Sequence, residues 1–269
     1  MLPLSQDIKE RIFMSNTAKA FENGKAFIPF VTAGDPDLNV TKDVIVAMAK
    51  AGADLIEIGI PFSDPVAEGL VIQAADERAL KAGTTTDKIF DMIAQVRAET
   101  DVPLAIMTYM NPVFVYGVDK FCKKCAEIKI DALIVPDVPF EEKTEIVPYC
   151  KKYDIDVISF IAPTSQERVK TIAKEAEGFI YCVSSMGVTG VRQNITTDVG
   201  EMTSLVKEVS DVPTAIGFGI STPQQAKDMA QYADGIIVGS AIVKLCEKHG
   251  KDCVPYVYDY VKEMKEAII

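Results

Sequence analysis

Short apolar segments alternate with longer amphipathic segments along most of the chain. The short segments are rich in branched residues and often end at glycine or proline, which is typical of strands buried on both faces. The longer segments carry apolar residues at helical spacing between capping and stop residues, which predicts helices. The expected strands are 26–31, 54–59, 102–107, 133–135, 156–161, 179–183, 213–216 and 235–238. The expected helices are 39–51, 71–81, 87–99, 119–128, 141–152, 165–175, one through 209, one that begins at 222–223 and one that opens at 239–240.

An α/β fold follows from this alternation, because parallel strands need crossover helices, either in an open doubly wound sheet or in a closed barrel. Eight strand–helix units over residues 25–269 favour a (β/α)8 TIM barrel. Residues 4–23 predict an amphipathic helix that stops at Asn23-Gly24. We therefore expect a single TIM-barrel domain over 1–269, with residues 1–24 as an extra N-terminal helix.

The charge balance narrows the range of partners. A net charge of -11, a pI near 4.7 and the lack of a basic cluster argue against a nucleic-acid or anionic-membrane partner. No apolar run has the length of a membrane span, and the first residues do not resemble a signal peptide, so a cytoplasmic location is expected. The six cysteines are scattered, and we interpret them as reduced thiols, including the isolated Cys122-Lys-Lys-Cys125 pair.

His249 is the only histidine, which excludes a metal site built from several histidines. No metal site is predicted. Acid–base chemistry is then left to carboxylates or tyrosine.

Glu57 interrupts the apolar strand 54–59. A carboxylate inside a buried strand is unfavourable unless it is paired or neutral. Glu68 lies on the loop that follows, so both acids belong to the carboxyl end of one strand, where barrel enzymes carry their chemistry. Glu57 is therefore a candidate catalytic residue; the alternative is a core acid that accepts hydrogen bonds from backbone amides or an arginine.

Glycines follow the last three expected strands, in Gly187–Gly190, Gly217–Ser221 and Gly239-Ser240. Glycine lets the backbone approach an oxygen closely, and the amides that open a helix at Ser240 favour an anion, so together these segments predict a phosphate site. The patterns of nucleotide triphosphate and dinucleotide sites are missing from the sequence. Aromatic residues at strand ends either wall a pocket for a flat substrate or pack at the barrel mouth: Phe30, Tyr109, Tyr181 and Phe218.

Seven motifs along the chain carry a resemblance to a known family. They are Phe30-Val-Thr-Ala-Gly-Asp-Pro36, Glu57-Ile-Gly-Ile-Pro-Phe-Ser-Asp-Pro65, Tyr109-Met-Asn-Pro112, Pro136-Asp-Val-Pro139, Gly187-Val-Thr-Gly190, Gly217-Phe-Gly-Ile-Ser221 and Gly239-Ser-Ala-Ile-Val243. Together they resemble the tryptophan synthase alpha subunit over almost the whole chain. The lack of tryptophan in the sequence is consistent with a tryptophan-pathway enzyme.

The resemblance implies a lyase that cleaves indole-3-glycerol phosphate to indole and glyceraldehyde 3-phosphate, with no cofactor in this chain. It assigns the acid–base role to Glu57 and places Glu68 where the family usually has an aspartate that faces the indole nitrogen. Leu70 replaces the usual proline, and Ser185 replaces a common arginine. The longer side chain of Glu68 moves its oxygens, so we expect the loop to settle differently.

The resemblance also implies the binding residues and a partner. It assigns an indole pocket to Phe30, Tyr109 and Tyr181, orientation of the catalytic glutamate to Thr189, and phosphate binding to Gly190, Gly219, Gly239 and Ser240. Gly217 is expected among the substrate-binding residues as well. It implies an alpha2beta2 heterotetramer with a beta subunit that uses pyridoxal phosphate. The surface expected to face that partner includes Pro61, Asp64 and Asn111.

Three other functions stay open at this stage. The first is a free-standing lyase that releases indole, which the sequence barely distinguishes from a subunit of a complex. The second is a catalytically weak regulatory partner of the beta subunit, against which the retention of both carboxylates argues. The third is another phosphate-binding barrel such as a sugar-phosphate isomerase, which the single histidine and the Glu57 segment disfavour.

Overall fold

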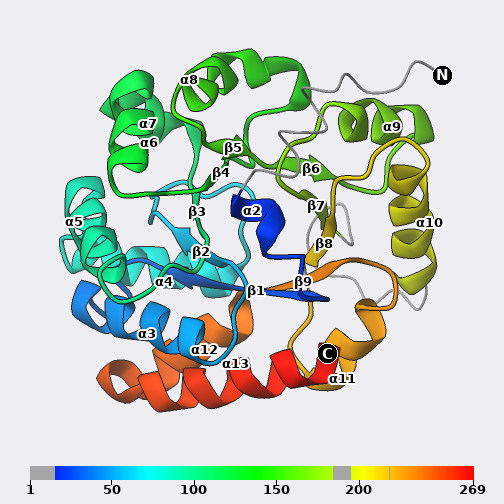
Figure 1. Ribbon diagram of the computed structural model, residues 1–269. Helices are drawn as coiled ribbons and strands as arrows, with labels where there is room; N and C mark the ends of the chain where they lie inside the picture. Colours follow the sequence, from blue (N-terminus) through cyan, green and yellow to red (C-terminus); the bar gives the residue numbers. More distant parts are fainter. Residues whose placement is uncertain (1–15, 184–194, 218) are drawn as a thin grey trace.

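Parallel strands form one continuous sheet at the centre of the molecule (Figure 1). The computed structural model describes residues 16–183, 195–217 and 219–269. In these ranges the sheet order is β5-β4-β3-β2-β1-β9-β8-β7-β6. The strands are β1 (Ala26–Thr32), β2 (Ile56–Gly59), β3 (Leu104–Met107), β4 (Ala132–Ile134), β5 (Asp156–Val157), β6 (Ser159–Ile161), β7 (Ile180–Val183), β8 (Thr214–Gly217) and β9 (Gly235–Val238).

The two outer strands of this order are halves of one segment. β5 pairs with β4 and β6 pairs with β7, and only Ile158 separates the two halves along the chain. Each half therefore bonds to one neighbour, and the ring closes through the chain itself. The predicted TIM barrel is confirmed, with its fifth strand divided in two.

Helices surround the ring of strands (Figure 1). They are α2 (Asn16–Lys19), α3 (Leu38–Lys50), α4 (Leu70–Lys81), α5 (Thr86–Val96), α6 (Met110–Tyr116), α7 (Val118–Glu127), η1 (Phe140–Glu145), α8 (Val147–Lys152), α9 (Gln166–Lys174), α10 (Ile195–Lys207), α11 (Pro223–Met229), α12 (Ser240–His249), η2 (Gly250–Asp252) and α13 (Val254–Ile268). In the described ranges no helix has both the length and the apolar character to cross a membrane.

One predicted helix needs correction, and two helices of the structure were not predicted. The helix predicted over 141–152 is divided into η1 and α8, because Pro148 has no N–H with which to continue the helix across that point. The sequence reading missed α6 and α13, although α13 buries Val257, Val261 and Met264 at helical spacing.

The leading helix ends earlier than predicted. Within residues 16–24 it is helical only over Asn16–Lys19, after which Phe21 and Glu22 donate to carbonyls three residues back, so the chain turns before Asn23. Residues 4–15 of the predicted helix lie outside the described ranges. The described part covers the amino end of the barrel, where the rings of Phe21 and Phe179 lie 5.7 Å apart.

The barrel interior is filled in layers. Near the amino ends of the strands the inward side chains are apolar, and they form one cluster: Ile28, Leu55, Ala105, Ile134, Ile158, Phe179, Ala215 and Ile237. The outward side chains of the strands pack against the helices in a second, larger cluster. Because both faces are covered, every residue of β1, β2, β8 and β9 is buried, which explains their continuous apolar runs.

A buried ion pair fastens α5 to the sheet below it. The Arg97 guanidinium follows α5 and lies 2.7 Å from the Asp131 carboxylate, which also accepts the N–H of Leu104 at 2.8 Å. Both charged side chains are about nine-tenths buried. Arg97 Nε donates as well to the carbonyl of Lys129 at 3.0 Å, so one side chain holds the helix end and the segment before β4 together.

We expect Arg97→Leu to lower the free energy of unfolding by about 3 kcal/mol, because it removes the Arg97 cation from a buried ion pair. Lys81→Leu is the matched control, since Lys81 forms an exposed pair with Glu77 and its loss should change the unfolding midpoint little. Urea denaturation of the two variants measures the difference. Equal midpoints would contradict a structural role for the buried pair.

Candidate active site

The second inward layer of the barrel, toward the carboxyl ends of the strands, differs in chemistry from the first. Side chains two residues apart on a strand point to the same face, so each member of this layer follows an apolar core residue by two positions. The layer comprises Phe30, Glu57, Met107, Phe160, Tyr181, Gly217 and Gly239. The barrel thus brings together five residues predicted from sequence: Phe30, Glu57, Tyr181, Gly217 and Gly239.

Glu57 is a buried acid with an unpaired oxygen. Its side chain is 1% exposed, and within the described ranges no donor reaches Oε1. The alternative of a core acid satisfied by backbone amides or an arginine therefore finds no support at that oxygen. Burial raises the pKa of Glu57 to about 8, so the carboxyl is mostly protonated at neutral pH and can both give and take a proton near that pH.

Aromatic rings stand beside Glu57. Phe30 is its register partner on β1, and the charge of Glu57 helps to raise the pKa of the buried Tyr181. The rings of Phe160 and Tyr181 lie 4.9 Å apart, and those of Phe62 and Tyr109 lie 5.2 Å apart. Phe30 and Tyr181 therefore give the Glu57 carboxyl group aromatic neighbours, which suit a flat apolar molecule.

Two glycines make room for these rings. A Cβ at Gly59 would lie 2.5 Å from Cζ of Phe30, and a Cβ at Gly217 would lie 2.5 Å from Oη of Tyr181. Any side chain at either position would displace an aromatic ring. Gly217 thus has a packing function that the sequence reading did not foresee.

The predicted phosphate residues divide into described and undescribed ones. Gly219 has φ of +77°, which favours glycine, and a Cβ there would meet no atom of the described residues within 4 Å. Gly239 precedes α12, whose first amides have no side-chain cap, and exposed Ser240 opens that helix. Thr189, Gly190, Ser185 and Phe218 lie outside the described ranges.

Glu68 lies on the loop between β2 and α4, partly buried. Hydrogen bonds fix the loop on either side of the carboxyl group: the Ala67 N–H donates to Tyr109 Oη at 3.0 Å, and Gln73 Nε2 donates to the Glu68 carbonyl at 2.7 Å. The Glu68 carboxyl meets that of Asp76 on α4, and burial raises the pKa of Glu68. Sequence reasoning missed Asp76, although an acid on the apolar face of the predicted helix 71–81 was a usable signal.

The nearest arginine on α4 is already paired. Arg78 donates through Nε and Nη2 to the two oxygens of Asp35, both at 2.8 Å, and through Nη1 to Glu247. Asp35 is 2% exposed, and its contact with the guanidinium raises the pKa of Arg78. This network joins the loop after β1 to α4 and α12, and it leaves Glu68 and Asp76 without a cation from Arg78.

The residues predicted to face a partner have different exposures. Asp64 and Asn111 are exposed, whereas Pro61 is buried in the isolated chain. Four large apolar side chains on the same two connections, after β2 and after β3, are more than two-thirds exposed: Val66, Leu70, Phe114 and Val115. The sequence reading did not identify these four as surface residues.

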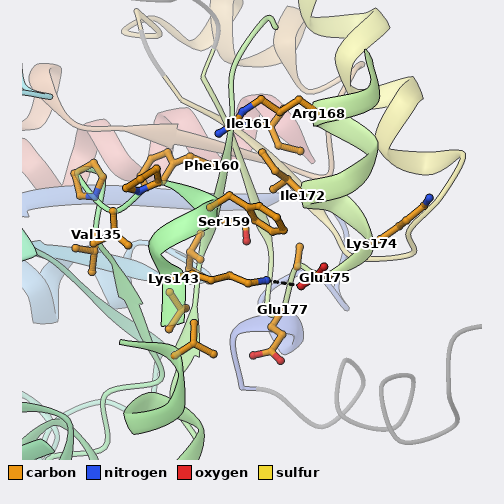
Figure 2. A pocket seen from close by; sticks show the side chains of 18 of the residues that line it. Val135, Lys143, Ser159, Phe160, Ile161, Arg168, Ile172, Lys174, Glu175 and Glu177 are labelled. Atoms are coloured by element: carbon orange, nitrogen blue, oxygen red, sulfur yellow. Dashed lines mark hydrogen bonds and ion pairs between the residues drawn. The ribbon is translucent and has the colours of Figure 1, made fainter. Parts of the chain in front are cut away.

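The cavities detected away from the barrel mouth contain none of the predicted site residues. Figure 2 shows one of about 490 Å³ between η1, α8 and α9 on the outer side of the divided strand, where Lys143 pairs with Glu175 at 2.6 Å. Another, of about 760 Å³, is lined by Phe21, Lys207 and Asp234 near the amino ends of the strands. Because none of the predicted site residues lines either cavity, neither one is the candidate site. No group of acidic, cysteine or histidine side chains in the described part of the chain is arranged to hold a metal ion.

Comparison with known proteins decides the family. The family model described as tryptophan synthase alpha chain matches residues 16–269. The tryptophan synthase alpha chain of Lacticaseibacillus casei is 49% identical over 257 residues, covering 96% of this chain and 97% of the relative, and that of Thermoanaerobacter sp. (strain X514) is 45% identical, covering 92% and 95%. A chain in the crystal structure of tryptophan synthase from M. tuberculosis, aminoacrylate-bound form, superimposes with a TM-score of 0.85 at 30% identity, covering 95% of this chain and 100% of that one.

The chain belongs to the tryptophan synthase alpha chain family. The resemblance inferred from the motifs is therefore confirmed. The barrel described above is that of solved structures in the tryptophan synthase alpha chain family. The roles of individual residues remain predictions for this member.

The pKa of Glu57 generates a stability prediction. Its value in the folded protein, about 8, exceeds its ordinary value of 4.5, so the protonated carboxyl stabilises the fold fully below pH 4.5, and this contribution is lost as the pH rises through 8. Glu57→Gln is neutral at every pH and avoids the loss. Between pH 6 and pH 9 its thermal midpoint should rise relative to the parent by about 5 °C or more.

Glu77→Gln is the control for that comparison, since Glu77 is an exposed acid on α4 paired with Lys81. Its midpoint should follow the parent across the same pH range. Parallel profiles for Glu57→Gln and the parent would contradict the raised pKa of Glu57.

Proposed function

We propose that this chain cleaves indole-3-glycerol phosphate to indole and glyceraldehyde 3-phosphate, with Glu57 as acid and base. The observation that carries the proposal is the position of Glu57: a buried carboxyl with a pKa of about 8, in the carboxyl-end layer of the barrel beside Phe30 and Tyr181. Membership of the tryptophan synthase alpha chain family supports the same reaction.

The reaction makes three demands on the site. Ring carbon 3 of the indole must gain a proton, the hydroxyl of the adjacent glycerol carbon must lose one, and the ring nitrogen must be stabilised while it carries positive charge. The carbon–carbon bond then breaks, its electron pair returns to the ring and the glycerol carbon becomes a carbonyl. Glu57 supplies the first proton and accepts the second, because a pKa close to neutral pH suits both transfers.

Glu68 meets the third requirement, which is to stabilise the positive charge on the ring nitrogen. A fixed carboxylate beside the ring nitrogen stabilises charge that develops only in the transition state, which lowers the barrier more than it strengthens substrate binding. The neighbouring Tyr109 joins the wall of the indole pocket, and its hydroxyl holds the loop through the N–H of Ala67. Phe30 and Tyr181 form the other side of the pocket.

The phosphate group binds at the backbone of Gly219, Gly239 and Ser240. The backbone of Gly219 and the uncapped first amides of α12 offer N–H donors to an anion. Thr189 and Gly190 keep their predicted roles of orienting Glu57 and holding phosphate. The proposed chemistry needs only proton transfers, so this chain uses no cofactor, and pyridoxal phosphate belongs to the beta subunit.

We propose a tryptophan synthase beta subunit as the partner, in an alpha2beta2 assembly. The exposed apolar side chains Val66, Leu70, Phe114 and Val115 lie with Asp64 and Asn111 on the connections after β2 and β3. Exposed large apolar groups gathered at one rim favour a protein interface over a free-standing lyase. The same two connections carry Glu68 and Tyr109, so binding of a partner at this rim can act on the site directly.

The experiment that tests the function follows indole and triose phosphate together. The chain is incubated with indole-3-glycerol phosphate, alone and then with a tryptophan synthase beta subunit. We expect the two products in equal amounts, with faster turnover when the partner is present. Failure to release either product under both conditions would contradict the proposal.

Glu57→Gln should abolish nearly all turnover, by about a hundredfold or more, because it keeps the volume of the side chain but cannot transfer a proton. Substrate binding should change little, since the moving protons exist only in the transition state. Steady-state turnover and calorimetric binding of substrate separate the two effects, with Glu77→Gln as control. A Glu57→Gln enzyme that retains a tenth of the parent activity would refute the assignment.

Phe114→Lys should weaken binding of the beta subunit by about tenfold or more, because it replaces a large apolar contact with a charge at the proposed interface. Tyr149→Lys is the control: Tyr149 is a partly exposed aromatic on α8, away from the connections after β2 and β3. Surface plasmon resonance with immobilised beta subunit measures both affinities. Equal affinities for the two variants would remove Phe114 from the interface.

A further inference from the structure

Glu68 and Asp76 are neighbouring carboxyl groups, and each has a buried oxygen that no donor of the described residues reaches. Oε2 of Glu68 and Oδ2 of Asp76 are both buried and have no hydrogen-bond partner within the described ranges. The two carboxyl groups nevertheless lie within hydrogen-bonding reach of each other. Asp76 is 4% exposed and projects from the buried face of α4 beside Ala75 and Ala79.

The groups around the pair leave it short of positive charge. Asp35, on the loop after β1, adds its charge to the site, and its cation Arg78 is divided between Asp35 and Glu247. Tyr109, next to β3, lies close enough to both acids for their charges to add to the effect of burial in raising its pKa. Within the described ranges no donor reaches Oε2 of Glu68 or Oδ2 of Asp76, so nothing there offsets two negative charges at those oxygens.

Two ionised carboxylates only accept hydrogen bonds, so their contact is attractive only when one of them keeps a proton. Asp76 is the better site for that proton, since it is the more deeply buried of the two acids. Burial and the neighbouring charge of Glu68 raise the pKa of Asp76 to about 9. The proton of the pair therefore resides on Asp76, whose carboxyl can donate it in a hydrogen bond to Glu68.

We propose that Asp76 is a positioning residue for Glu68: its protonated carboxyl donates a hydrogen bond that orients the Glu68 carboxylate toward the substrate ring. The inference deepens the proposed function and rests on it. Glu68 has one methylene more than the aspartate that the family resemblance leads us to expect, and each added rotatable bond has to be held. The contacts of Ala67 and Gln73 hold the backbone on either side of Glu68, and Asp76 holds its side chain.

An asparagine at position 76 tests this role, because its amide group has nearly the volume of the carboxyl group and can still donate toward Glu68. We expect Asp76→Asn to keep turnover within about threefold of the parent at pH 7. Asp76→Leu has a similar volume and no donor, and should lower kcat by about tenfold or more with little change in KM. Glu77→Leu is the matched control on the exposed face of α4.

A double-mutant cycle shows whether Asp76 acts through Glu68. If it does, Asp76→Leu should cost nothing further in a Glu68→Ala background, because the group it orients is already gone. Two results would overturn the proposal: an independent, additive loss in the double variant, or equal damage from Asp76→Asn and Asp76→Leu.

A titration separates this inference from the proposed function. Carboxyl NMR of the parent and of Glu68→Gln follows the ionisation of Asp76 without substrate. Removal of the neighbouring charge should lower the pKa of Asp76 by about 1 or more. An unchanged titration would refute the pair, even in an enzyme that cleaves the substrate. A normal pair in a chain that releases no indole would instead refute the proposed function alone.

Discussion

The strict alternation of side chains along parallel strands is the constraint on which this structure depends. Each strand turns one set of residues inward, and successive inward residues rise in layers through the barrel. The lower layer, with Leu55 and Phe179, is apolar and closed by the segment around Phe21. The upper layer, two residues later on each strand, places Glu57 and Tyr181 directly above this apolar layer. A slip of one residue in β2 would turn Glu57 outward and leave no acid at the centre of the mouth.

The apolar layer below the site raises the pKa of the buried carboxyl groups above it. A carboxylate loses hydration on entering such a site, and the protonated form gains unless a cation or several donors replace the lost water. No donor of the described residues replaces that water at Glu57 Oε1, and burial raises the pKa of Glu57 to about 8. Glu68 and Asp76 face the same shortage and meet each other, while Arg78 is held by Asp35 and Glu247. The candidate site of this acidic chain is thus built from the carboxyl groups of Glu57, Glu68 and Asp76, which have few hydrogen-bond donors around them in the described ranges.

The site and the surface proposed for the partner share the same two connections. The loop after β2 carries Glu68 and the exposed Val66 and Leu70, and the segment after β3 carries Tyr109 and the exposed Phe114. The hydrogen bond from Ala67 to Tyr109 joins the two segments. A shift of the loop between β2 and α4 would therefore move the Glu68 carboxylate directly, without a change in the barrel. This arrangement offers a short physical route by which an associated protein can alter turnover.

The sequence alone determined the barrel, because the fold depends on local periodicity, and it singled out Glu57 as a candidate, because an acid there breaks an apolar run. The division of the fifth strand at Ile158 came only from the structure, since it depends on which neighbour each half can pair with. The packing of Gly217 against Tyr181 is a contact between different strands, and the meeting of Glu68 with Asp76 joins a loop to the buried face of a helix. The types and spacings of residues do not show which side chains from separate segments come into contact. Tertiary structure therefore decided how the protons and aromatic rings of the site are arranged, because those depend on which side chains the closed barrel brings into contact.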